Sequence, residues 1–599
     1  MSIRQHRLVT LVACLAAIGA ALVVPHLVGR YYTQMMALAG IYAVVAHGLN
    51  LLVGYTGQTS LGHAGFYAIG AYTGALLATK LGLGFWSAFP FSMLVAAAAG
   101  FFIALPSLKL DGPYLAMVTI AFGIIVSSVL IEWSDLTGGT QGVLNIPRPS
   151  VAGVRVSPEY LFALIIGALV LTTLLLRNLI RSPWGRAFVA VRENPIAAQA
   201  VGLDTRAIKT VAFTISAALA GAGGHLFSFF QGFISPEAFE FDASIFFLTA
   251  VLFGGAGTLF GPIVGAPVMV FLPEMLQQFV DYRLIVYGSL IVACLYALPL
   301  GVVGTLSRRK TALPDLPAPP LDPASLEAVS PPRKTATGTG PLLSLRDIHM
   351  NFGGVRALNG IGFDIAPGAV HALIGPNGAG KTVLLNVVSG IYRPSSGDVR
   401  FDDRMIGGLP PHRITQLGIA RTFQTAQLFG AMTVLQNVMT GFPRQIRRRL
   451  LDSILSTPRI AREEAMRRAK AMDLLAFVGY PGDHGTLASA LPFGHQRLVE
   501  IARALATDPC LIAMDEPAAG LNPKEVADLD ELISRIRGRG IAVLLVEHHM
   551  DLVMGISDRI TVLDHGEKLA EGTPAEIQSD PHVISAYLGA EDVHAAMAD

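Results

Sequence analysis

The stretch that decides the fold of the C-terminal half runs Gly375-Pro-Asn-Gly-Ala-Gly-Lys-Thr382. It fits the nucleotide-binding pattern G-x-x-x-x-G-K-[S/T] at every fixed position. The apolar run 369–374 before it predicts a strand, and the residues after Thr382 predict the start of a helix. In that setting the glycines let backbone N–H groups surround phosphate oxygens, and the helix N-terminus adds a partial positive charge. The stretch therefore predicts a phosphate-binding loop, the alternative being a glycine-rich turn that fits the pattern by chance.

Two side chains of this loop have predicted roles. Lys381 can reach the β- and γ-phosphates of a nucleotide, and Thr382 can place its hydroxyl on Mg²⁺. The other loop residues bring the backbone close to the phosphates. The predicted nucleotide-binding loop consists of Gly375, Pro376, Asn377, Gly378, Ala379, Gly380, Lys381 and Thr382.

The composition of the chain hides two different halves. The 599 residues are 52% hydrophobic and 15% charged, and the charged share is well below that of a typical soluble protein. Long apolar runs fill residues 8–305, whereas residues from 342 onward predict a soluble α/β domain. The net charge of +1 favours no particular partner. The cysteines are far apart in apolar runs, so they predict neither a disulfide framework nor a metal site: Cys14, Cys294 and Cys510.

Residues 1–306 predict a polytopic α-helical membrane domain with about ten passes. A membrane-spanning helix needs about 20 mostly apolar residues. The first apolar segment follows Arg4 and Arg7 and shows no convincing cleavage site, which favours an uncleaved span over a signal peptide. Gly254–Thr258 interrupts one stretch, which predicts either two short passes or one kinked pass. The candidate segments are 8–28, 32–53, 61–79, 85–105, 114–131, 160–176, 208–229, 241–279 and 284–306.

Basic residues predict the orientation of these segments. Lysine and arginine are concentrated in the loop Arg181–Lys209 and in Arg308–Lys310. Cytoplasmic loops carry such an excess, so we predict that both stretches and the N-terminus lie in the cytoplasm. Two cytoplasmic ends require an even number of passes, which favours ten over nine. The segment 132–158 would then face outward.

Two glycine-rich stretches, 57–72 and 254–265, depart from plain lipid-facing helix. Small residues at this density let helices approach closely or break, and paired interrupted segments point to a transport pathway. Polar groups inside a bilayer are costly, which makes Gln58, Ser60 and His63 pathway candidates. The alternative is close packing without substrate contact, and for His63 taken alone this alternative is favoured.

The segment between the two predicted domains and one cytoplasmic loop bear on domain organisation. Residues 307–341 are rich in Pro, Ala, Ser and Thr, which predicts an extended linker between a membrane domain at 1–306 and a soluble domain at 342–599. In the basic loop, the sequence of residues 196–202 resembles the E-A-A-x-x-x-G coupling loop of ABC importer permeases, with Ile196 in place of Glu. The resemblance implies contact with a cytoplasmic ATPase through Arg192, Glu193, Ala197, Ala198 and Gly202.

The phosphate-binding loop is followed by further motifs in a fixed order. Each is weak alone, but their order and spacing together are specific. They are R-T-F-Q at 421–424, L-P-F-G-H-Q-R at 491–497, C-L-I-A-M-D-E at 510–516, A-A-G-L-N-P at 518–523 and A-V-L-L-V-E-H at 542–548. Through them the C-terminal half resembles the α/β P-loop nucleotide-binding domains of ABC transporters over essentially its whole length.

This resemblance implies a set of site roles and the cofactors ATP and Mg²⁺. Phe352 would stack on adenine, Asp515 would hold Mg²⁺, and Gln424 would sense Mg²⁺ and the membrane domain. Glu516 would be the general base and His548 would contact the γ-phosphate, with Lys381 completing the catalytic set. The signature loop would be Leu491, Pro492, Phe493, Gly494, His495 and Gln496.

Two positions depart from the family pattern. Pro492 stands where the signature has a phosphate-contacting Ser, and Pro offers neither a hydroxyl nor a backbone N–H. Asn522 stands where Asp is usual. The phosphate site of the chain itself keeps all its residues, so the resemblance implies a hydrolytic ATPase that pairs with a second ATPase domain.

The stretch Arg444–Lys470 is strongly basic. Nucleic-acid binding is one interpretation of such a charge run. A solvated helical face near an anionic membrane surface is the favoured one. We therefore predict no nucleic-acid partner.

Strings in both halves resemble one subfamily, the importers of hydrophobic, branched-chain amino acids. Examples are S-L-G-H-A-G-F-Y-A-I-G-A-Y at 60–72, R-E-N-P-I-A-A-Q-A-V-G at 192–202 and A-A-G-L-N-P at 518–523. The resemblance implies ATP-driven import across the bacterial inner membrane by a permease fused to its ATPase, with the ATPase domain and both termini cytoplasmic. It also implies three partners: a second permease, a second ATPase and an external substrate-binding protein. Import of urea, short amides or another small polar solute, export, and a non-transport ATP-gated protein remain alternatives.

Overall fold

The computed structural model describes residues 3–107, 112–151, 154–276, 282–306, 340–442 and 450–588. The chain divides into two compact units, which are treated separately below. The first unit holds the described residues of 1–193, 205–306 and 450–457, and the second holds those of 194–204, 340–442 and 458–588. This division differs from the predicted domain ranges in two short segments, 194–204 and 450–457. The predicted linker lies outside the described residues except at 340–341, and so does Arg308–Lys310.

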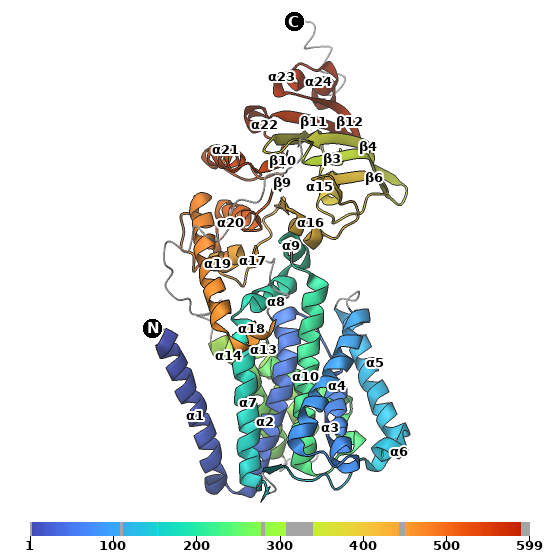
Figure 1. The fold of residues 1–599 in the computed structure, drawn as a ribbon, viewed down its shortest axis with the longest axis vertical. Coiled ribbons are helices and arrows are strands. Elements are labelled where there is room, and N and C mark those ends of the chain that lie inside the picture. The colour runs from blue at the N-terminus through green and yellow to red at the C-terminus, as the bar shows by residue number, and fades with distance from the viewer. Residues whose placement is uncertain are drawn as a thin grey trace. The chain divides into compact units, whose positions relative to one another are not determined.

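The first unit is helical, as predicted (Figure 1). Five of the described helices are long and apolar enough to cross a membrane; they run over Arg30–Tyr55, Phe85–Pro106, Pro113–Glu132, Pro158–Ile180 and Thr205–Gln231. The count of about ten passes therefore stays a prediction. The principal helices are α1 (Ile3–Val28), α2 (Arg30–Asn50), α3 (His63–Lys80), α4 (Phe85–Ser107), α5 (Pro113–Glu132), α7 (Pro158–Ile180), α8 (Pro183–Glu193), α10 (Thr205–Gln231), α11 (Phe241–Gly254), α12 (Gly261–Met275), α13 (Arg283–Ala297) and α14 (Gly301–Leu306).

Helix α10 is the central element of this unit, and small residues let its neighbours reach it. A Cβ on Gly70 of α3 would lie 2.2 Å from the carbonyl oxygen of Gly221, and one on Gly224 would lie 2.0 Å from that of Tyr67. Such backbone contact between helices needs glycine. The lipid-facing sides of α4 and α5 instead expose large apolar side chains, among them Phe102.

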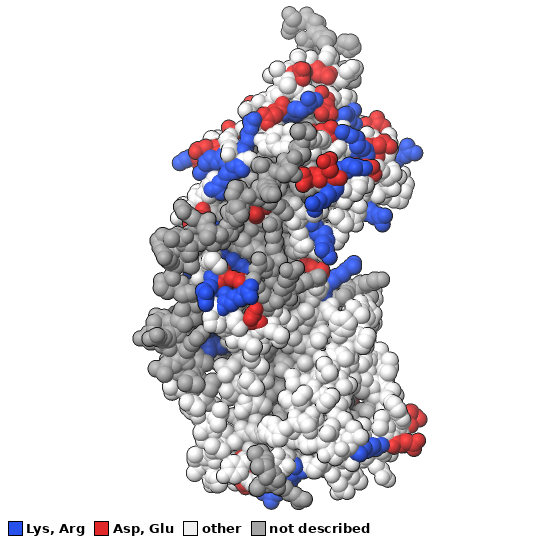
Figure 2. All heavy atoms as spheres, in the orientation of Figure 1, with Lys and Arg blue, Asp and Glu red and all other residues white. Residues whose placement is uncertain are grey.

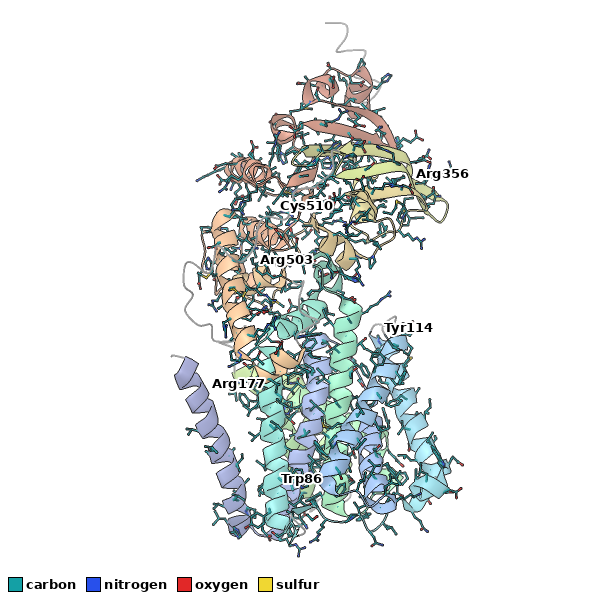
Figure 3. All side chains as sticks on the ribbon, in the orientation of Figure 1. Trp86, Tyr114, Arg177, Arg356, Arg503 and Cys510 are labelled. Atoms are coloured by element: carbon teal, nitrogen blue, oxygen red, sulfur yellow. The ribbon has the colours of Figure 1, made fainter. Side chains whose placement is uncertain are left out.

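Charge separates the two units. Figure 2 shows Lys, Arg, Asp and Glu gathered on the second unit, while most of the drawn surface of the helical unit is uncharged. Exposed aromatic residues such as Trp86 and Tyr114 lie on the helical unit (Figure 3), as expected for a surface that meets a bilayer.

The interrupted stretch 241–279 forms two helices rather than one kinked helix, over its described part to residue 276. Helices α11 and α12 are antiparallel: a Cβ on Gly254 would lie 1.9 Å from the carbonyl oxygen of Gly261, and one on Gly265 would lie 1.8 Å from that of Ala250. The turn between them is capped by Asn50, whose Nδ2 donates to the carbonyl oxygen of Thr258 at 2.7 Å. Both helices are too short to be among the five candidate spans.

The second unit is the predicted α/β ATPase fold. Its main sheet has the order β12-β11-β5-β10-β9-β8, and the strands from β11 to β8 are parallel. Their bounds are β5 (Val370–Ile374), β8 (Ile419–Arg421), β9 (Leu511–Asp515), β10 (Ala542–Val546), β11 (Arg559–Asp564) and β12 (Glu567–Gly572). Strands β5, β9 and β10 are buried along their full length, which explains their continuous apolar sequences.

A second, antiparallel sheet of order β4-β3-β6-β7 and a set of helices complete this unit. The strands are β3 (Leu343–Phe352), β4 (Val355–Ile365), β6 (Ser396–Phe401) and β7 (Arg404–Met405). The helices are α9 (Pro195–Ala200), α15 (Lys381–Val388), α16 (Pro411–Leu417), α17 (Val434–Thr440), α19 (Pro458–Phe477), α20 (Phe493–Leu505), α21 (Pro523–Gly538), α22 (Met550–Ile556), α23 (Pro574–Gln578) and α24 (Pro581–Leu588).

Helix α19 contains the described C-terminal part of the basic stretch 444–470. Two of its arginines pair with carboxylates of the same helix: Arg467 lies 3.1 Å from Glu464, and Arg459 lies 3.6 Å from Glu463. Arg459 is exposed, whereas Glu464 is buried and Arg467 nearly so, which means that only part of this helix faces solvent. The interpretation of the stretch as a solvated helical face stays a prediction.

Candidate functional site: a nucleotide-binding centre

The phosphate-binding loop joins β5 to α15 in a conformation that requires glycine. Gly375, Gly378 and Gly380 have φ angles of 149°, 85° and 96°. At Gly375 a Cβ would also lie 2.1 Å from the carbonyl oxygen of Leu563, and at Gly380 one would lie 2.7 Å from that of Ala357. The path of the loop is therefore one that only glycine adopts without strain, and it is fixed by its neighbours in β4 and β11.

The lysine of this loop folds back over it. Lys381 Nζ donates to the carbonyl oxygens of Gly375 and Pro376 at 2.7 and 2.9 Å. Burial lowers the pKa of Lys381, while the charges of Glu516 and Asp515 oppose this shift. Thr382 follows on the first turn of α15, and its side chain is exposed. A cation and a hydroxyl thus lie together at the start of α15, where phosphate groups are favoured.

Asp515 ends β9 with one carboxylate oxygen free for a cation. Its Oδ2 accepts a hydrogen bond from Arg421 Nη2 at 3.2 Å, whereas its buried Oδ1 has no hydrogen-bond partner among the described residues. Burial raises the pKa of Asp515, and Arg421 opposes that shift. A buried carboxylate oxygen without a partner needs an explanation, and a hard cation such as Mg²⁺ supplies one. The residues present therefore fit a magnesium site.

Glu516 is held at the meeting point of three segments. It has a φ of 45°, and its backbone N–H donates to the carbonyl oxygen of Val546 at 2.8 Å. Gln424 Nε2 donates to Glu516 Oε2 at 2.8 Å, and His548 Nε2 lies 3.3 Å from Glu516 Oε1. The structure thus brings together three residues that are far apart in the sequence. A carboxylate positioned by an amide and an imidazole can orient a water molecule for attack on a phosphate.

Glu547 was not among the predicted site residues, although it organises the same region. Its side chain is buried; Oε1 accepts from the backbone N–H of Ala518 at 2.6 Å, and Oε2 accepts from those of His548 and His549 at 2.8 and 3.3 Å. It therefore ties the loop after Glu516 to the loop that carries His548. The available sequence signal was a carboxylate at the end of the apolar strand 542–546.

Arg497 and Glu500 of α20 were also missed. Arg497 donates to the carbonyl oxygens of Phe423, Gln424 and Glu516, the last two at 2.6 and 3.3 Å. Glu500 pairs with Arg497 at 3.2 Å and accepts from the backbone N–H of Gln427 at 3.0 Å.

The charged side chains of Arg497, Glu500 and Arg503 are buried. Burial raises the pKa of Glu500, although Arg503 and Arg497 oppose the shift. Burial lowers the pKa of Arg503 to about 10. Arg503 lies in the interior of the unit (Figure 3). The start of α20 therefore holds the backbone around Gln424 and Glu516 through buried charged groups.

The predicted signature loop begins this same helix. Pro492 directly precedes α20, and its carbonyl oxygen accepts from the N–H of Gln496 at 3.0 Å, while Gln496 Nε2 donates to the carbonyl oxygen of Leu491 at 2.9 Å. The residue before the first turn accepts a helical hydrogen bond through its carbonyl oxygen, but its own N–H donates none within the helix. Pro is therefore compatible with the fold here. The ring of Phe493 lies against Gly520, Gly494 lies against the carboxylate of Glu525, and the ring of His495 lies 5.6 Å from that of Tyr480.

Two further predicted positions have clear local settings. Phe352 ends β3 with 42% of its surface exposed, as expected for a ring that stacks on a base. The ring of Tyr392, which was not predicted, meets it edge-on at 5.2 Å. Asn522, the second departure from the family pattern, caps α21 by accepting from the N–H of Glu525 at 3.0 Å.

The predicted coupling residues divide between the two units. Arg192 and Glu193 end α8 in the first unit, where Arg192 donates to the carbonyl oxygen of Gly54 at 2.6 Å. Residues 194–204 belong to the second unit, where Ala197 and Ala198 are buried.

Within the second unit, α9 lies against α16. Thr415 Oγ1 donates to the carbonyl oxygen of Ala200 at 3.0 Å, and Gln416 Nε2 donates to that of Gly202 at 3.3 Å. Asn194 Nδ2 also donates to Gln427 Oε1 at 2.6 Å, three residues after Gln424. The predicted docking segment therefore contacts the loop that carries Gln424, a predicted cofactor-binding residue.

The pathway candidates Gln58, Ser60 and His63 are all buried in the first unit. Ser60 Oγ lies 3.0 Å from His63 Nδ1, and His63 Nε2 lies 2.7 Å from Ser216 Oγ. Gln58 Oε1 accepts from Thr56 Oγ1 at 3.1 Å. Ser60 and His63 thus belong to one local network, and Gln58 bonds Thr56 separately, which supports the packing alternative without testing a transport role.

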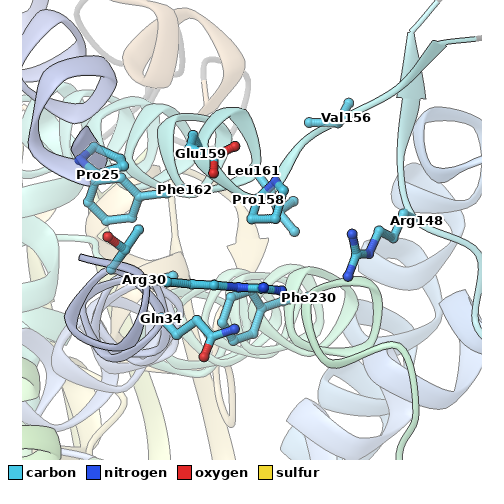
Figure 4. A pocket seen from close by; sticks show the side chains of 12 residues that line it. Pro25, Arg30, Gln34, Arg148, Val156, Pro158, Glu159, Leu161, Phe162 and Phe230 are labelled. Carbon is cyan, nitrogen blue, oxygen red and sulfur yellow. The ribbon is translucent and has the colours of Figure 1, made fainter.

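A separate hollow of about 100 Å³ lies where α2 and α7 begin. The side chains of Arg30 and Arg148 extend toward one another across it, and Glu159 lies on its other side (Figure 4). The hollow therefore presents two guanidinium groups at the end of the helical unit where α7 begins. Helix α8 follows the opposite end of α7.

Comparison with known families gives separate matches in the N-terminal and C-terminal halves of the chain. Residues 31–295 match the family described as "Branched-chain amino acid transport system / permease component". Residues 358–519 match "ABC transporter", and residues 567–593 match "Branched-chain amino acid ATP-binding cassette transporter".

Two curated relatives match the two halves separately. The high-affinity branched-chain amino acid transport ATP-binding protein LivG of Escherichia coli K12 is 44% identical over 250 residues, which cover 42% of this chain and 98% of LivG. The permease protein LivM of the same organism is 40% identical over 305 residues, which cover 47% of this chain and 71% of LivM. Among solved structures, a nucleotide-free ATP-binding cassette from an ABC transporter is 34% identical and covers 42% of this chain and 99% of that one, with a TM-score of 0.37.

Proposed function

Because this chain belongs to the branched-chain amino acid ABC transporter family, with a permease domain fused to an ATP-binding cassette, we propose that it drives the import of branched-chain amino acids by ATP hydrolysis. The observation that carries the proposal is the convergence of Gln424, Glu516 and His548 beside a glycine-rich phosphate loop. That geometry is suited to turnover of ATP and not only to its binding. The permease half supplies the membrane pathway through which ATP hydrolysis would drive transport.

The chemical step assigns one task to each residue of the centre. Lys381 leaves its loop carbonyls to meet the β- and γ-phosphates, and Phe352 stacks on the adenine ring. Glu516 orients the attacking water and accepts its proton, while His548 and Gln424 hold the Glu516 carboxylate in place. Thr382, Gln424 and Asp515 would hold Mg²⁺, which when bound neutralises the charge of the phosphates.

Coupling runs through the loop 423–427. Gln424 contacts Glu516, and Gln427 of the same loop contacts Asn194 at the start of α9. A change at the γ-phosphate that moves Glu516 would therefore pull on α9 through a short chain of hydrogen bonds. Arg192 and Glu193, which precede α9, would carry this motion toward the permease helices.

One chain supplies one permease domain and one ATPase domain, and the proposed partners complete the transporter. We propose a second permease, a second ATPase and an external substrate-binding protein, with the ATPase domain on the cytoplasmic side of a bacterial inner membrane. Pro492 provides no hydroxyl for a nucleotide held by the other ATPase. The two guanidinium groups of Arg30 and Arg148 favour an acidic partner surface at the external end.

A paired substitution tests this function. Glu516→Gln keeps the hydrogen bond from Gln424 but removes the base, so ATP binding should persist while uptake of radiolabelled leucine, isoleucine and valine stops. Glu531→Gln on exposed α21 is the matched control and should behave as wild type. Normal amino acid uptake by Glu516→Gln would contradict the proposal, and uptake of urea in place of branched-chain amino acids by the wild type would reassign its substrate.

A further inference from the structure

The first unit contains a cavity of about 200 Å³ that none of the predicted pathway residues lines. It lies between the start of α3, the middle of α5 and the segment that leads into α11. Leu61 and Ala64, which directly follow Ser60 and His63 in the sequence, line it. Its volume suits a small solute better than a single water molecule.

The break in the helix before α3 fixes the walls of this cavity. Residues 57–62 are not part of an α-helix, and Leu61 donates its backbone N–H to Thr119 Oγ1 of α5 at 3.0 Å. Ala64 donates its backbone N–H to Ser244 Oγ of α11 at 3.0 Å. Thr119 and Ser244 thus attach α5 and α11 to the point where the break ends and α3 begins.

The cavity also lies beside helices that are long and apolar enough to cross a membrane. His63, the first residue of α3, bonds Ser216 near the middle of α10, which is one of the five candidate spans. Non-helical backbone among membrane helices is tolerated where it is buried in protein or lines a cavity, and interrupted helices mark binding sites in transporters.

The lining combines three kinds of chemistry. Leu61, Ile120 and Ile124 give an apolar wall. Ser127 and Ser128 of α5 bring hydroxyl groups that have no hydrogen bond within the described parts of the chain. Glu240 is the one charged residue among those that line the cavity, and it is exposed and has no ion pair with any described residue. An unpaired carboxylate among apolar membrane helices is costly, which makes Glu240 a functional candidate.

We propose that this cavity is a substrate subsite of the transport pathway that binds an aliphatic α-amino acid as its zwitterion. Glu240 pairs with the ammonium group, and the hydroxyls of Ser127 and Ser128 donate to the carboxylate. The branched side chain lies against Leu61, Ile120 and Ile124. This inference rests on the proposed import of branched-chain amino acids, and it adds a selective site within the permease to any selection made outside the membrane.

A charge-removing pair of variants tests the ammonium contact in the complete transporter. Glu240→Gln should lower the maximal rate of leucine uptake at least about tenfold. Glu237→Gln is the matched control, because Glu237 is also exposed, lies three residues earlier and does not line the cavity. Equal uptake by the two variants would overturn the subsite. Absence of branched-chain amino acid uptake by the wild-type complex would instead overturn the proposed function.

A size-changing pair tests the apolar wall on neighbouring residues. Ile124 and Ile125 are 57% and 59% exposed on α5, but only Ile124 is among the residues that line the cavity. Ile124→Trp should reduce leucine uptake at least about tenfold, and Ile125→Trp should change it less than twofold. Comparable losses in both variants would show that the effect comes from the outer face of α5 and would contradict the subsite.

Direct occupancy can be measured without any partner protein. In the full chain, with Cys14, Cys294 and Cys510 replaced by Ser, a Ser128→Cys thiol in lipid nanodiscs should be alkylated by a small maleimide. Saturating leucine should slow this alkylation at least about threefold, whereas glucose should not change it. The same alkylation rate with leucine and with glucose would overturn the proposal, and because this measurement needs only a folded chain it also guards against a misfolded Glu240→Gln variant.

Discussion

The ATP-binding centre and the helix break before α3 are both rich in polar residues, but their polar atoms are used in different ways. At the centre, Asp515 Oδ1 is buried without a hydrogen bond to any described residue, and Lys381 bonds only loop carbonyls that it can exchange for phosphate. At the break, both ring nitrogens of His63 have serine partners within the unit. Polar atoms that converge on one place without hydrogen-bond partners in the protein indicate a ligand site. Polar atoms that bond one another within the protein indicate packing. Substrate binding near the break is therefore expected at Glu240 and Ser128, which line the neighbouring cavity, and not at His63.

The largest effect is expected from Arg497→Met, which would dismantle the support of the ATP centre. The substitution removes three bonds to loop carbonyls and leaves Glu500 beside one fewer positive charge. Breaking a buried pair in this way costs about 3–5 kcal/mol. ATP hydrolysis by the full chain in detergent should fall more than about 100-fold, with a clear drop in melting temperature.

Two further variants show whether this effect comes from positioning. Arg497→Lys keeps a positive charge beside Glu500 but lacks the planar fork, so it should restore the melting temperature more than the rate of hydrolysis. Arg535→Met on exposed α21 removes an arginine from the surface and should leave both quantities near wild type. Hydrolysis by Arg497→Met within tenfold of wild type would mean that α20 does not hold the centre together.

The sequence predicted those parts of the centre that local patterns determine. The residues 375–382 and the carboxylates 515–516 follow apolar strands directly, so their positions could be derived from neighbouring residues. Glu547 and Arg497 escaped prediction because they bond backbone groups of distant segments, and no side-chain pattern marks such a contact. Their role becomes visible only once β9, β10 and α20 are adjacent.

In the helical unit, too, the sequence predicted local features but not contacts between distant segments. The predicted segment 85–105 corresponds to α4 at Phe85–Ser107, because the length of an apolar run reports the length of a span directly. The predicted segments 32–53 and 61–79 left a gap that contains most of the break at 57–62, but the bonds of Leu61 and Ala64 to Thr119 and Ser244 on distant helices could not be predicted from neighbouring residues. The pathway candidates were therefore chosen by polarity, and the cavity-lining Glu240 was passed over because it lies at the edge of an apolar segment.

The next largest effect is expected at Gly62, where the break approaches α5. A Cβ at this position would lie 2.1 Å from the carbonyl oxygen of Thr119, and backbone cannot yield as a side chain can. Gly62→Ala should therefore destabilise the unit by at least about 2 kcal/mol, read as a lower melting temperature of the full chain. Gly123→Ala is the control, since its Cβ would meet nothing nearer than 3.7 Å. Equal melting temperatures for both variants would show that the break is not tightly packed.

A third, pH-dependent effect is expected in the ATPase unit. Burial in β5 lowers the pKa of His371 from 6.5 to about 4, while its ring stacks on Phe363 at 4.7 Å and Nε2 lies 2.8 Å from Thr561 Oγ1. The unfolded chain therefore binds more protons between pH 6.5 and 4, so stability is lost as the pH falls through that range. The loss should reach about 2 kcal/mol at pH 5 relative to pH 7.

His371→Gln keeps a partner for Thr561 without a titrating group, so its melting temperature should fall less than that of wild type between pH 7 and pH 5. His565→Gln changes a histidine whose side chain is 95% exposed and should reproduce the wild-type pH dependence. A pH dependence of His371→Gln that equals that of His565→Gln would mean that His371 does not titrate differently in the folded state.

The smallest effect is expected from Ser216→Ala, and it bears most directly on the packing interpretation of the helix break. Removing this hydroxyl leaves His63 Nε2 buried without its partner, which costs about 1–3 kcal/mol. Ser228→Ala on the same helix is the control, because Ser228 is equally buried and its hydroxyl only donates to the carbonyl oxygen of His225 in its own helix. If the network is structural, Ser216→Ala lowers the melting temperature while leucine uptake per folded complex stays within about twofold of the control. A large loss of uptake at an unchanged melting temperature would move His63 and Ser216 from the packing of the helix break to the transport pathway itself.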